Sequence, residues 1–377
     1  MLQSIPPRVI IHKVGALSLK WTTKFGLGSI GLRSLIYYKK YVDRLLKANH
    51  FDLIFFSTTQ FPVCILGAWW KKKFGIPYVI DMQDPWHSDY YRDKPRNERP
   101  PKYWFSYRLN KYLEPLAVGK ADGLMAVSEK YIRDLKARYP RITHVPEAVI
   151  TFGAFAPDLK VAQANRDRFI NLAGTGVIRI VYVGRAGTDM HQALRPMFKA
   201  IRTGLSVEPD LYKKFRFYFI GTSYARQGSG IPTVEPLAAR YGLGDQVYEF
   251  TDRISYYHTL SALENADALL IPGSDDPNYT PSKLYPYLLS HKPLLAIFHE
   301  QSTAVNTLQE CVEGAAIVTF GLQRKNVAID IGRVLSAWAV GDFKTIVHRP
   351  GFQQYSAEAL TGEQVKLFDQ VISNFEK

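Results

Sequence analysis

The segment NYTPSKLYPY, residues 278–287, contains residue types that proteins use to hold an anion. Thr280 or Ser282 can cap a helix start, and Pro281 suits a first helical turn. A helix start presents unpaired backbone N–H groups and the positive end of the helix dipole, and Lys283 adds a full charge beside them. We therefore predict that Pro281, Ser282 and Lys283 bind an anion. A purely structural helix start is the competing interpretation.

Three loops with glycine or arginine follow apolar runs in the same half of the chain. VGRAGTDMH, at 183–191, combines glycines that let backbone approach a ligand with an arginine that can bind a phosphate. FIGTSYARQGSG, at 219–230, is also glycine-rich, and FTDRISYY, at 250–257, has an arginine directly after its apolar run. Ordinary turns and a surface arginine are the competing interpretations. The candidate binding residues are Gly184, Arg185, Gly187, Gly221, Thr222 and Arg253.

In the first half, VIDMQDPWHSDYYRD, at 79–93, places acids and a histidine beside aromatic rings. Carboxylates accept hydrogen bonds from hydroxyls, and rings cover the apolar faces of sugars. Asp81, Asp84, Trp86 and His87 are therefore candidates for sugar binding. The same side chains could ligate a metal, but their spacing is irregular and the chain has no Asp-x-Asp. We expect neither a metal nor a cofactor.

The elements that position these residues alternate between short apolar runs and helical patterns. This alternation predicts parallel sheets with helices on both faces, and hence an α/β chain of two Rossmann-like, doubly wound domains facing a cleft. In the second half the predicted strands are 178–184, 215–222, 247–251, 268–273, 293–298 and 315–320, and the predicted helices are 191–204, 233–242, 255–266, 282–291, 302–312 and 326–340. In the first half the predicted strands are 8–14, 51–58, 77–82, 123–128 and 142–149, and the predicted helices are 32–49 and 102–119.

The predicted domains are residues 1–150 and 178–345, separated by a polar linker at 151–177. A helical tail at 346–377 is expected to pack back on the first domain. Residues 1–150 hold 25 Lys and Arg against 12 Asp and Glu, which is +13 of the chain's net charge of +14. Such a basic domain is typical of proteins that meet an anionic membrane surface, a lipid phosphate or nucleic acid, and a charge distribution without function is the alternative.

The two cysteines, Cys64 and Cys311, are far apart and lie in apolar runs. We expect buried free thiols, which favour a reducing compartment. The predicted location is cytoplasmic, with peripheral attachment to the inner face of the plasma membrane.

IPYVIDMQDPW in the first half, and VGR, FIG and ADALLIPG…PSKLYPYLLSHKPLLAI in the second, resemble GT-B glycosyltransferases of the retaining family 4 type. The resemblance covers about residues 50–375. It implies a nucleotide-sugar donor bound by the C-terminal domain and an acceptor bound by the N-terminal domain. Arg185 matches the family arginine that contacts the donor diphosphate, and the helix start at Ser282, Lys283 and Leu284 matches the backbone that receives it.

The sequence departs from this family at three contacts. The family lysine falls at His191, and the two family glutamates, which hold donor sugar and ribose, fall at Asn278 and Pro286. Backbone or Tyr285 or Tyr287 would then have to hold the ribose. The first domain is also expected to lack the initial β-α-β elements of the family.

The resemblance predicts a hexosyltransferase-type enzyme for polysaccharide biosynthesis, retaining and metal-independent. It would move a sugar from a nucleotide-diphosphate sugar to a polysaccharide or lipid-linked acceptor. Arg185 and Lys283 would stabilise the departing diphosphate, and Asp84 would bind the acceptor hydroxyl. A non-catalytic binding protein on the same fold is the main alternative. A nucleotide-sugar epimerase and a nucleic-acid-binding protein are weaker ones, and we expect no nucleic acid partner.

Overall fold

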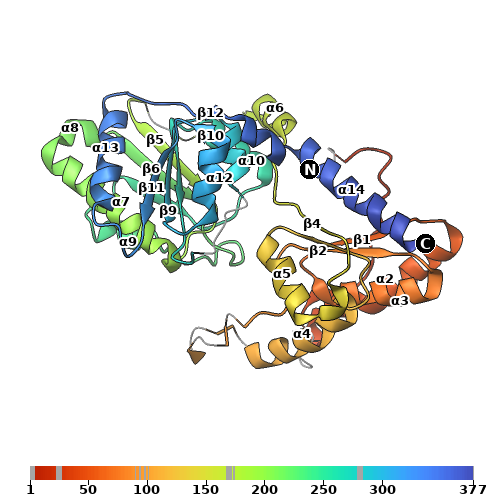
Figure 1. The fold of residues 1–377 in the computed structure, drawn as a ribbon. Helices are drawn as coiled ribbons and strands as arrows, with labels where there is room; N and C mark the ends of the chain where they lie inside the picture. Colours follow the sequence, from red (N-terminus) through yellow and green to blue (C-terminus); the bar gives the residue numbers. More distant parts are fainter. Residues whose placement is uncertain are drawn as a thin grey trace. The chain divides into compact units, whose positions relative to one another are not determined.

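A computed structural model describes residues 5–22, 28–89, 91–92, 95–96, 99–100, 102–166, 172, 175–277 and 283–376. The chain forms two compact units (Figure 1). Unit 1 contains Met1–Thr151 and Leu360–Lys377, and unit 2 contains Phe152–Ala359. Each unit has its own parallel sheet, which confirms the predicted fold class.

Unit 2 is built on a six-stranded parallel sheet in the order β11-β9-β8-β5-β6-β7. Its strands are short apolar runs, and β8 is buried along its whole length, as expected for a sheet covered on both faces. The strands are β5 (Ile178–Val183), β6 (Phe215–Ile220), β7 (Val247–Phe250), β8 (Ala268–Pro272), β9 (Leu294–His299) and β11 (Ala316–Phe320).

Helices cover this sheet between successive strands. α7 packs side by side with α13, and α6 packs on α10 (Figure 1). A small antiparallel pair, β10 (Val312–Glu313) with β12 (Val347–His348), lies beside them. The helices of unit 2 are α6 (Ala156–Ala164), α7 (His191–Val207), α8 (Pro209–Tyr212), α9 (Glu235–Ala239), α10 (Tyr256–Glu264), α11 (Leu284–Leu289), α12 (Thr303–Cys311) and α13 (Val327–Ala339), with 3-10 turns η7 (Thr188–Met190) and η8 (Pro350–Tyr355).

Unit 1 is built on a four-stranded parallel sheet in the order β1-β2-β3-β4. One face packs on α3, α4 and α5 through alternate strand residues such as Phe56, Ile80 and Leu124. The strands are β1 (Ile54–Ser57), β2 (Tyr78–Met82), β3 (Gly123–Ala126) and β4 (Glu147–Val149). The helices are α1 (Leu19–Thr22), α2 (Ile30–Ala48), α3 (Ile65–Phe74), α4 (Tyr103–Val118) and α5 (Glu129–Arg138), with 3-10 turns η3 (Phe61–Cys64) and η5 (Pro140–Ile142).

The other face of this sheet is covered by the C-terminal helix α14 (Ala357–Phe375). Leu367 and Val371 of α14 form a separate apolar cluster with Val79 and Met125, which alternate with the residues of the first face. The last helix of the chain thereby completes the core of the first unit.

The predicted strand at 8–14 is wrong. These residues form no strand and run beside α2, where the Tyr41 hydroxyl lies 2.6 Å from Nδ1 of His12. Their short run of β-branched residues suggested a strand, but Val9, Ile10 and Ile11 are exposed, and no neighbouring strand pairs with them in the described ranges. Local pattern alone therefore misled the prediction.

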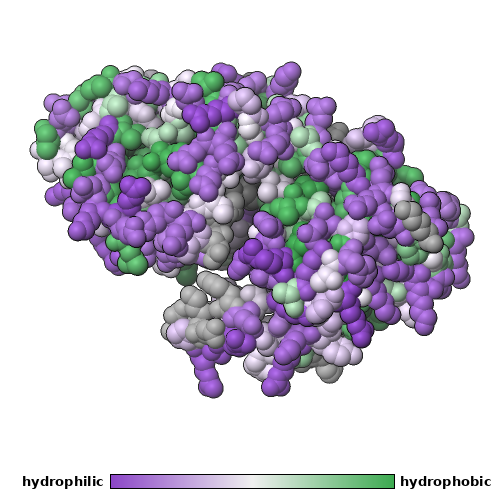
Figure 2. Space-filling view, in the orientation of Figure 1, coloured by the Kyte–Doolittle hydropathy of each residue, from purple (hydrophilic) through white to green (hydrophobic). Residues whose placement is uncertain are grey.

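The face of the molecule seen in Figure 2 is mostly hydrophilic, with apolar groups in limited patches. No helix in the part of the chain that the structure describes is both long and apolar enough to cross a bilayer.

Candidate functional site

The strand order of unit 2 reverses between β5 and β8. β5 continues through β6 to β7 on one side, whereas the chain returns to β8 and continues through β9 to β11 on the other. Parallel α/β sheets bind ligands at the carboxyl ends of the strands where the order reverses. The loop after β5 and the loop after β8 are therefore the expected position of a site.

Lys283, from the loop after β8, lies against Tyr182, near the end of β5. Its Nζ atom is 4.3 Å from the centroid of the Tyr182 ring and donates a hydrogen bond to the phenol oxygen. The Tyr182 hydroxyl in turn donates to the backbone oxygen of Arg185, at 2.6 Å. These contacts fix the position of the lysine ammonium at the carboxyl end of β5.

Gly184 leaves the space that Lys283 occupies. A Cβ atom added to Gly184 would lie 2.0 Å from Nζ of Lys283, and the residue has a φ of +151° that favours glycine. Gly184, which was predicted to let a ligand approach the backbone, therefore also leaves room for the Lys283 side chain.

Burial, followed by the charges of Arg185 and Arg253, lowers the pKa of Lys283 from 10.5 to about 7. The charge of Asp189 opposes this lowering, so three cations and one carboxylate act on one another at this edge of the sheet. A bound anion would relieve the repulsion between the cations and favour the charged lysine.

Arg185 is held by Asp189, one helical turn further along the chain. The guanidinium donates two hydrogen bonds to the carboxylate, at 2.9 and 2.5 Å. Burial raises the pKa of Asp189, but the hydrogen bonds and charge of Arg185 outweigh it and hold this pKa below its usual range. Gly187 leaves room for the pair, because a Cβ there would lie 2.5 Å from Oδ1 of Asp189 and 2.6 Å from Nη1 of Arg185.

Arg253 lies beside the loop after β6. A Cβ on Gly221, whose φ is +73°, would be 3.6 Å from the Arg253 Cα. The Arg253 guanidinium lies 4.7 Å from the centroid of the Tyr224 ring. The hydroxyl of Thr222 instead donates to the buried carboxylate of Glu249, at 2.7 Å, so this side chain stabilises the loop.

His191 begins α7, and its Nε2 lies 3.1 Å from the backbone oxygen of Thr233. Leu284 is buried, and the ring of Tyr285 stacks on Tyr355 at 4.9 Å. The predicted site residues Asn278, Pro281 and Ser282 lie outside the described residues.

The hydroxyl of Tyr287 accepts a hydrogen bond from the backbone nitrogen of Val183, at 2.6 Å, and donates to its oxygen, at 3.1 Å. This tyrosine therefore ties α11 to β5. The sequence suggested Tyr285 and Tyr287 as ribose contacts. The hydroxyl of Tyr287 is hydrogen-bonded to the backbone of β5, and Tyr285 is buried with its ring against Tyr355.

In unit 1, Asp81 lies at the end of β2, where it accepts hydrogen bonds from Ser57 and Gln83, both at 2.9 Å. Its other carboxylate oxygen is buried without a partner among the described residues. Burial raises the pKa of Asp81 against these two hydrogen bonds, and burial also raises the pKa of Asp84. Asp81 lies within β2 and is buried, so its environment disfavours its charge, whereas Asp84 follows the strand and is an exposed residue.

Trp86 and His87 are buried beside this loop. Trp86 stacks on Phe61, with ring centroids 5.5 Å apart, so its indole belongs to the core. The backbone nitrogen of His87 donates to the buried carboxylate of Glu114, at 2.8 Å, which fixes the loop. Both ring nitrogens of His87 are buried without a hydrogen-bond partner in the described part of the chain, and burial lowers its pKa.

The structure therefore brings Gly184, Arg185, Lys283 and Arg253 together in unit 2, and Asp81 with its neighbours Ser57 and Gln83 in unit 1. Sequence reasoning missed Tyr182 and Asp189, which orient the two main cations. In the sequence, Tyr182 looks like an ordinary residue of a buried strand. The four-residue spacing of Arg185 and Asp189 was a signal that could have identified the pair.

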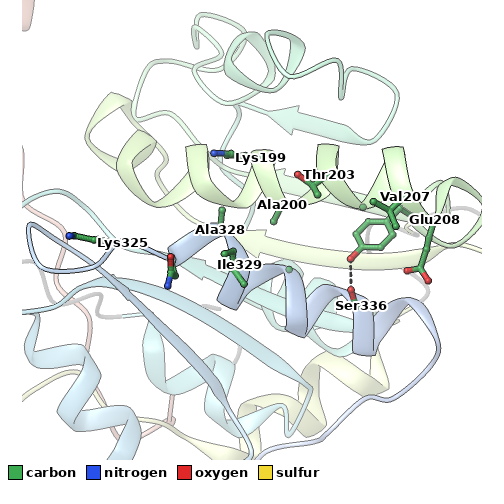
Figure 3. A pocket seen from close by; sticks show the side chains of 13 residues that line it. Lys199, Ala200, Thr203, Val207, Glu208, Lys325, Ala328, Ile329 and Ser336 are labelled. Carbon is green, nitrogen blue, oxygen red and sulfur yellow. Dashed lines mark hydrogen bonds between the residues drawn. The ribbon is translucent and has the colours of Figure 1, made fainter.

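A separate hollow of about 400 Å³ lies between α7 and α13, where the Tyr212 and Ser336 hydroxyls are hydrogen-bonded at 2.8 Å (Figure 3). Small and apolar residues such as Ala200, Gly204 and Gly332 form its walls. It contains none of the predicted site residues.

Residues 21–151 match the model of the family Glycosyltransferase Family 4. No curated protein matches the chain. Among solved structures, the chain is similar to sucrose-phosphate synthase from Thermosynechococcus elongatus, with 15% identity and a TM-score of 0.59 over 98% of this chain and 87% of that one.

The chain is also similar to a glycosyltransferase from Rickettsia africae, with 11% identity and a TM-score of 0.52 over 90% of this chain and 82% of that one. A third similar structure is alpha,alpha-trehalose 6-phosphate synthase from Burkholderia multivorans, with 12% identity and a TM-score of 0.51 over 91% of this chain and 74% of that one. At these identities the likeness shows a shared fold.

Proposed function

We propose that this chain is a GT-B-fold glycosyltransferase and that it uses a nucleotide-diphosphate sugar as its donor. The match of residues 21–151 to the model of Glycosyltransferase Family 4 supports this proposal. The enzyme transfers the sugar to a polysaccharide or lipid-linked acceptor, with retention at the transferred carbon and without a metal. The observation that carries the proposal is the group of three cations, Lys283, Arg185 and Arg253, at the strand-order reversal of unit 2.

The cations suit the charge that develops in such a reaction. As the bond from sugar to diphosphate breaks, positive charge builds on the sugar and negative charge on the departing diphosphate. Preorganised cations aimed at that diphosphate stabilise the transition state more than the ground state. Lys283, held by Tyr182, and Arg185, held by Asp189, are the side chains proposed for this role.

The acceptor is proposed to bind in unit 1 near Asp81 and Asp84. One oxygen of Asp81 and both ring nitrogens of His87 have no hydrogen-bond partner among the described residues, and we propose that sugar hydroxyls supply one. The departing phosphate oxygen is proposed to take the acceptor proton, so the chain need not supply a base. The excess of basic residues in 1–150 supports an anionic membrane surface as a further partner.

A non-catalytic binding protein on the same fold is the second candidate. The replacement of the three family side chains by His191, Asn278 and Pro286 favours it. Both candidates bind the donor, but only the enzyme transfers its sugar.

The test is a titration of UDP- and GDP-sugars followed by melting temperature, with Lys283→Ala and Arg185→Ala as matched variants. We expect at least one donor to raise the melting temperature of the wild type, and we expect this rise to be lost in both variants. Release of free nucleoside diphosphate in the presence of a glycan or lipid-linked acceptor then identifies the enzyme, whereas binding without release identifies the binding protein. No shift with any donor would refute donor binding and with it both candidates.

A further inference from the structure

The outer face of α4 carries large apolar side chains. Trp104, Tyr112 and Leu116 are 64%, 68% and 46% exposed on this one helix. α4 lies at the periphery of unit 1 (Figure 1). We propose that this face docks unit 1 on the surface of an anionic lipid bilayer. The inference rests on the proposed function, because such docking would bring the enzyme to a lipid-linked acceptor.

The exposed residues share one side of the helix. At 100° per residue, Trp104, Arg108, Tyr112 and Leu116 follow one another with steps of about 40° around the axis. Leu113 and Ala117 point the other way and pack in the core of unit 1. The apolar side chains of the outer face therefore add nothing to the core.

The charges of this face have one sign. Arg108 and Lys111 are exposed, and the Arg108 guanidinium lies 5.7 Å from the centroid of the Trp104 ring. Glu114 is the helix's acidic residue, and it is fully buried, where it accepts hydrogen bonds from Arg138 and Tyr139. No carboxylate of α4 therefore faces outward to repel an anionic surface.

This combination of aromatic, aliphatic and cationic groups fits a membrane interface. Tryptophan and tyrosine favour the headgroup level of a bilayer, where their rings meet acyl chains and their polar atoms meet water. Arginine and lysine are drawn to anionic headgroups. The net charge of +13 over residues 1–150 adds a longer-range attraction of the same sign.

The experiment is flotation of the full chain with vesicles of phosphatidylcholine alone and of phosphatidylcholine mixed with phosphatidylglycerol. We expect binding to the anionic vesicles that weakens with salt. The variant Trp104→Ser/Tyr112→Ser should bind on the order of tenfold more weakly, whereas Trp69→Ser should bind as the wild type does. Trp69 is a matched control because it is 45% exposed in the same unit and also lies beside a cation, Lys39.

The charge contribution is tested with Arg108→Gln/Lys111→Gln against Lys47→Gln/Lys72→Gln, which removes two exposed lysines elsewhere in the unit. The first pair should weaken binding to anionic vesicles on the order of tenfold, and the second should do so much less. Equal loss in both pairs, or wild-type flotation of the Trp104→Ser/Tyr112→Ser variant, would overturn the assignment to α4.

The donor-induced rise in melting temperature is measured on the same variants. Its retention shows that they are folded and that donor binding is intact, so a failure of docking stays distinguishable from a failure of the proposed function. Absence of the rise in the wild type would count against the function instead.

Discussion

The Nζ atom of Lys283 lies 4.3 Å from the centroid of the Tyr182 ring and is hydrogen-bonded to the hydroxyl of the same side chain. The two residues are 101 positions apart in the sequence and meet where the strand order of unit 2 reverses. Tyr182 thereby holds a cation at the position where parallel α/β sheets bind their ligands.

Replacing Lys283 with methionine should weaken nucleoside diphosphate binding by about tenfold to a hundredfold, since a hydrogen bond to a charged group contributes about 1.5–3 kcal/mol. Calorimetric titration with UDP and GDP measures the effect. Lys292→Met, on the strand-connecting turn after α11, is the control. An unchanged dissociation constant in the Lys283 variant would rule out contact between this lysine and the diphosphate.

Nucleoside diphosphate binding should weaken as pH rises above about 7. The pKa of Lys283 is lowered to about 7 in the free protein, and a bound diphosphate favours the charged lysine and raises that pKa. Binding therefore takes up a proton, and affinity falls by up to about tenfold per pH unit until the pKa of the complex is reached. Calorimetry in buffers of different ionisation enthalpy measures the proton uptake, which Lys283→Met should abolish.

The same lowered pKa affects stability. Between about 7 and 10.5 the unfolded chain carries the Lys283 proton and the folded chain does not, so this residue makes stability rise with pH across that window. Thermal denaturation should show that Lys283→Met flattens this rise. A parallel pH profile in wild type and variant would contradict the lowered pKa.

Gly184→Ala should impair donor binding because the new Cβ would lie 2.0 Å from Nζ of Lys283 and displace the ammonium. The backbone φ of +151° at this position also disfavours alanine. The expected signature is loss of the donor-induced rise in melting temperature together with lower stability. Gly244→Ala is the matched control, since nothing lies within 4 Å of a Cβ there. An equal donor-induced rise in melting temperature in Gly184→Ala and Gly244→Ala would show that donor binding does not depend on the position of Lys283.

Glu114→Ala should destabilise unit 1 by about 1–3 kcal/mol, because the hydrogen-bond donors around the buried carboxylate lose their acceptor. The carboxylate is fully buried and receives hydrogen bonds from Arg138, Tyr139 and the backbone of His87. Its loss should also loosen the loop that carries Asp84 and His87, so acceptor binding should suffer more than donor binding. Urea denaturation and separate donor and acceptor titrations distinguish the two effects.

The sequence alone determined the α/β class and most strands of unit 2, because buried parallel strands are short apolar runs with glycine or proline at their ends. The same reasoning failed at 8–14, where a short β-branched run occurs without a neighbouring strand in the described residues. It also selected Gly184, Arg185 and Lys283 as candidates, since glycine and cations after strands are local signals, and the structure places them close together.

The tertiary structure decided which residues hold these cations and which candidates support the scaffold. Tyr182 and Lys283 meet through the pairing of β5 with β8, a contact that no local pattern contains. Trp86, Thr222 and Tyr287 turned out to pack or hydrogen-bond within their own units, because burial and partner choice depend on segments distant in sequence. The sequence therefore determined which residue types follow the strands, and long-range packing determined how their side chains are held relative to one another.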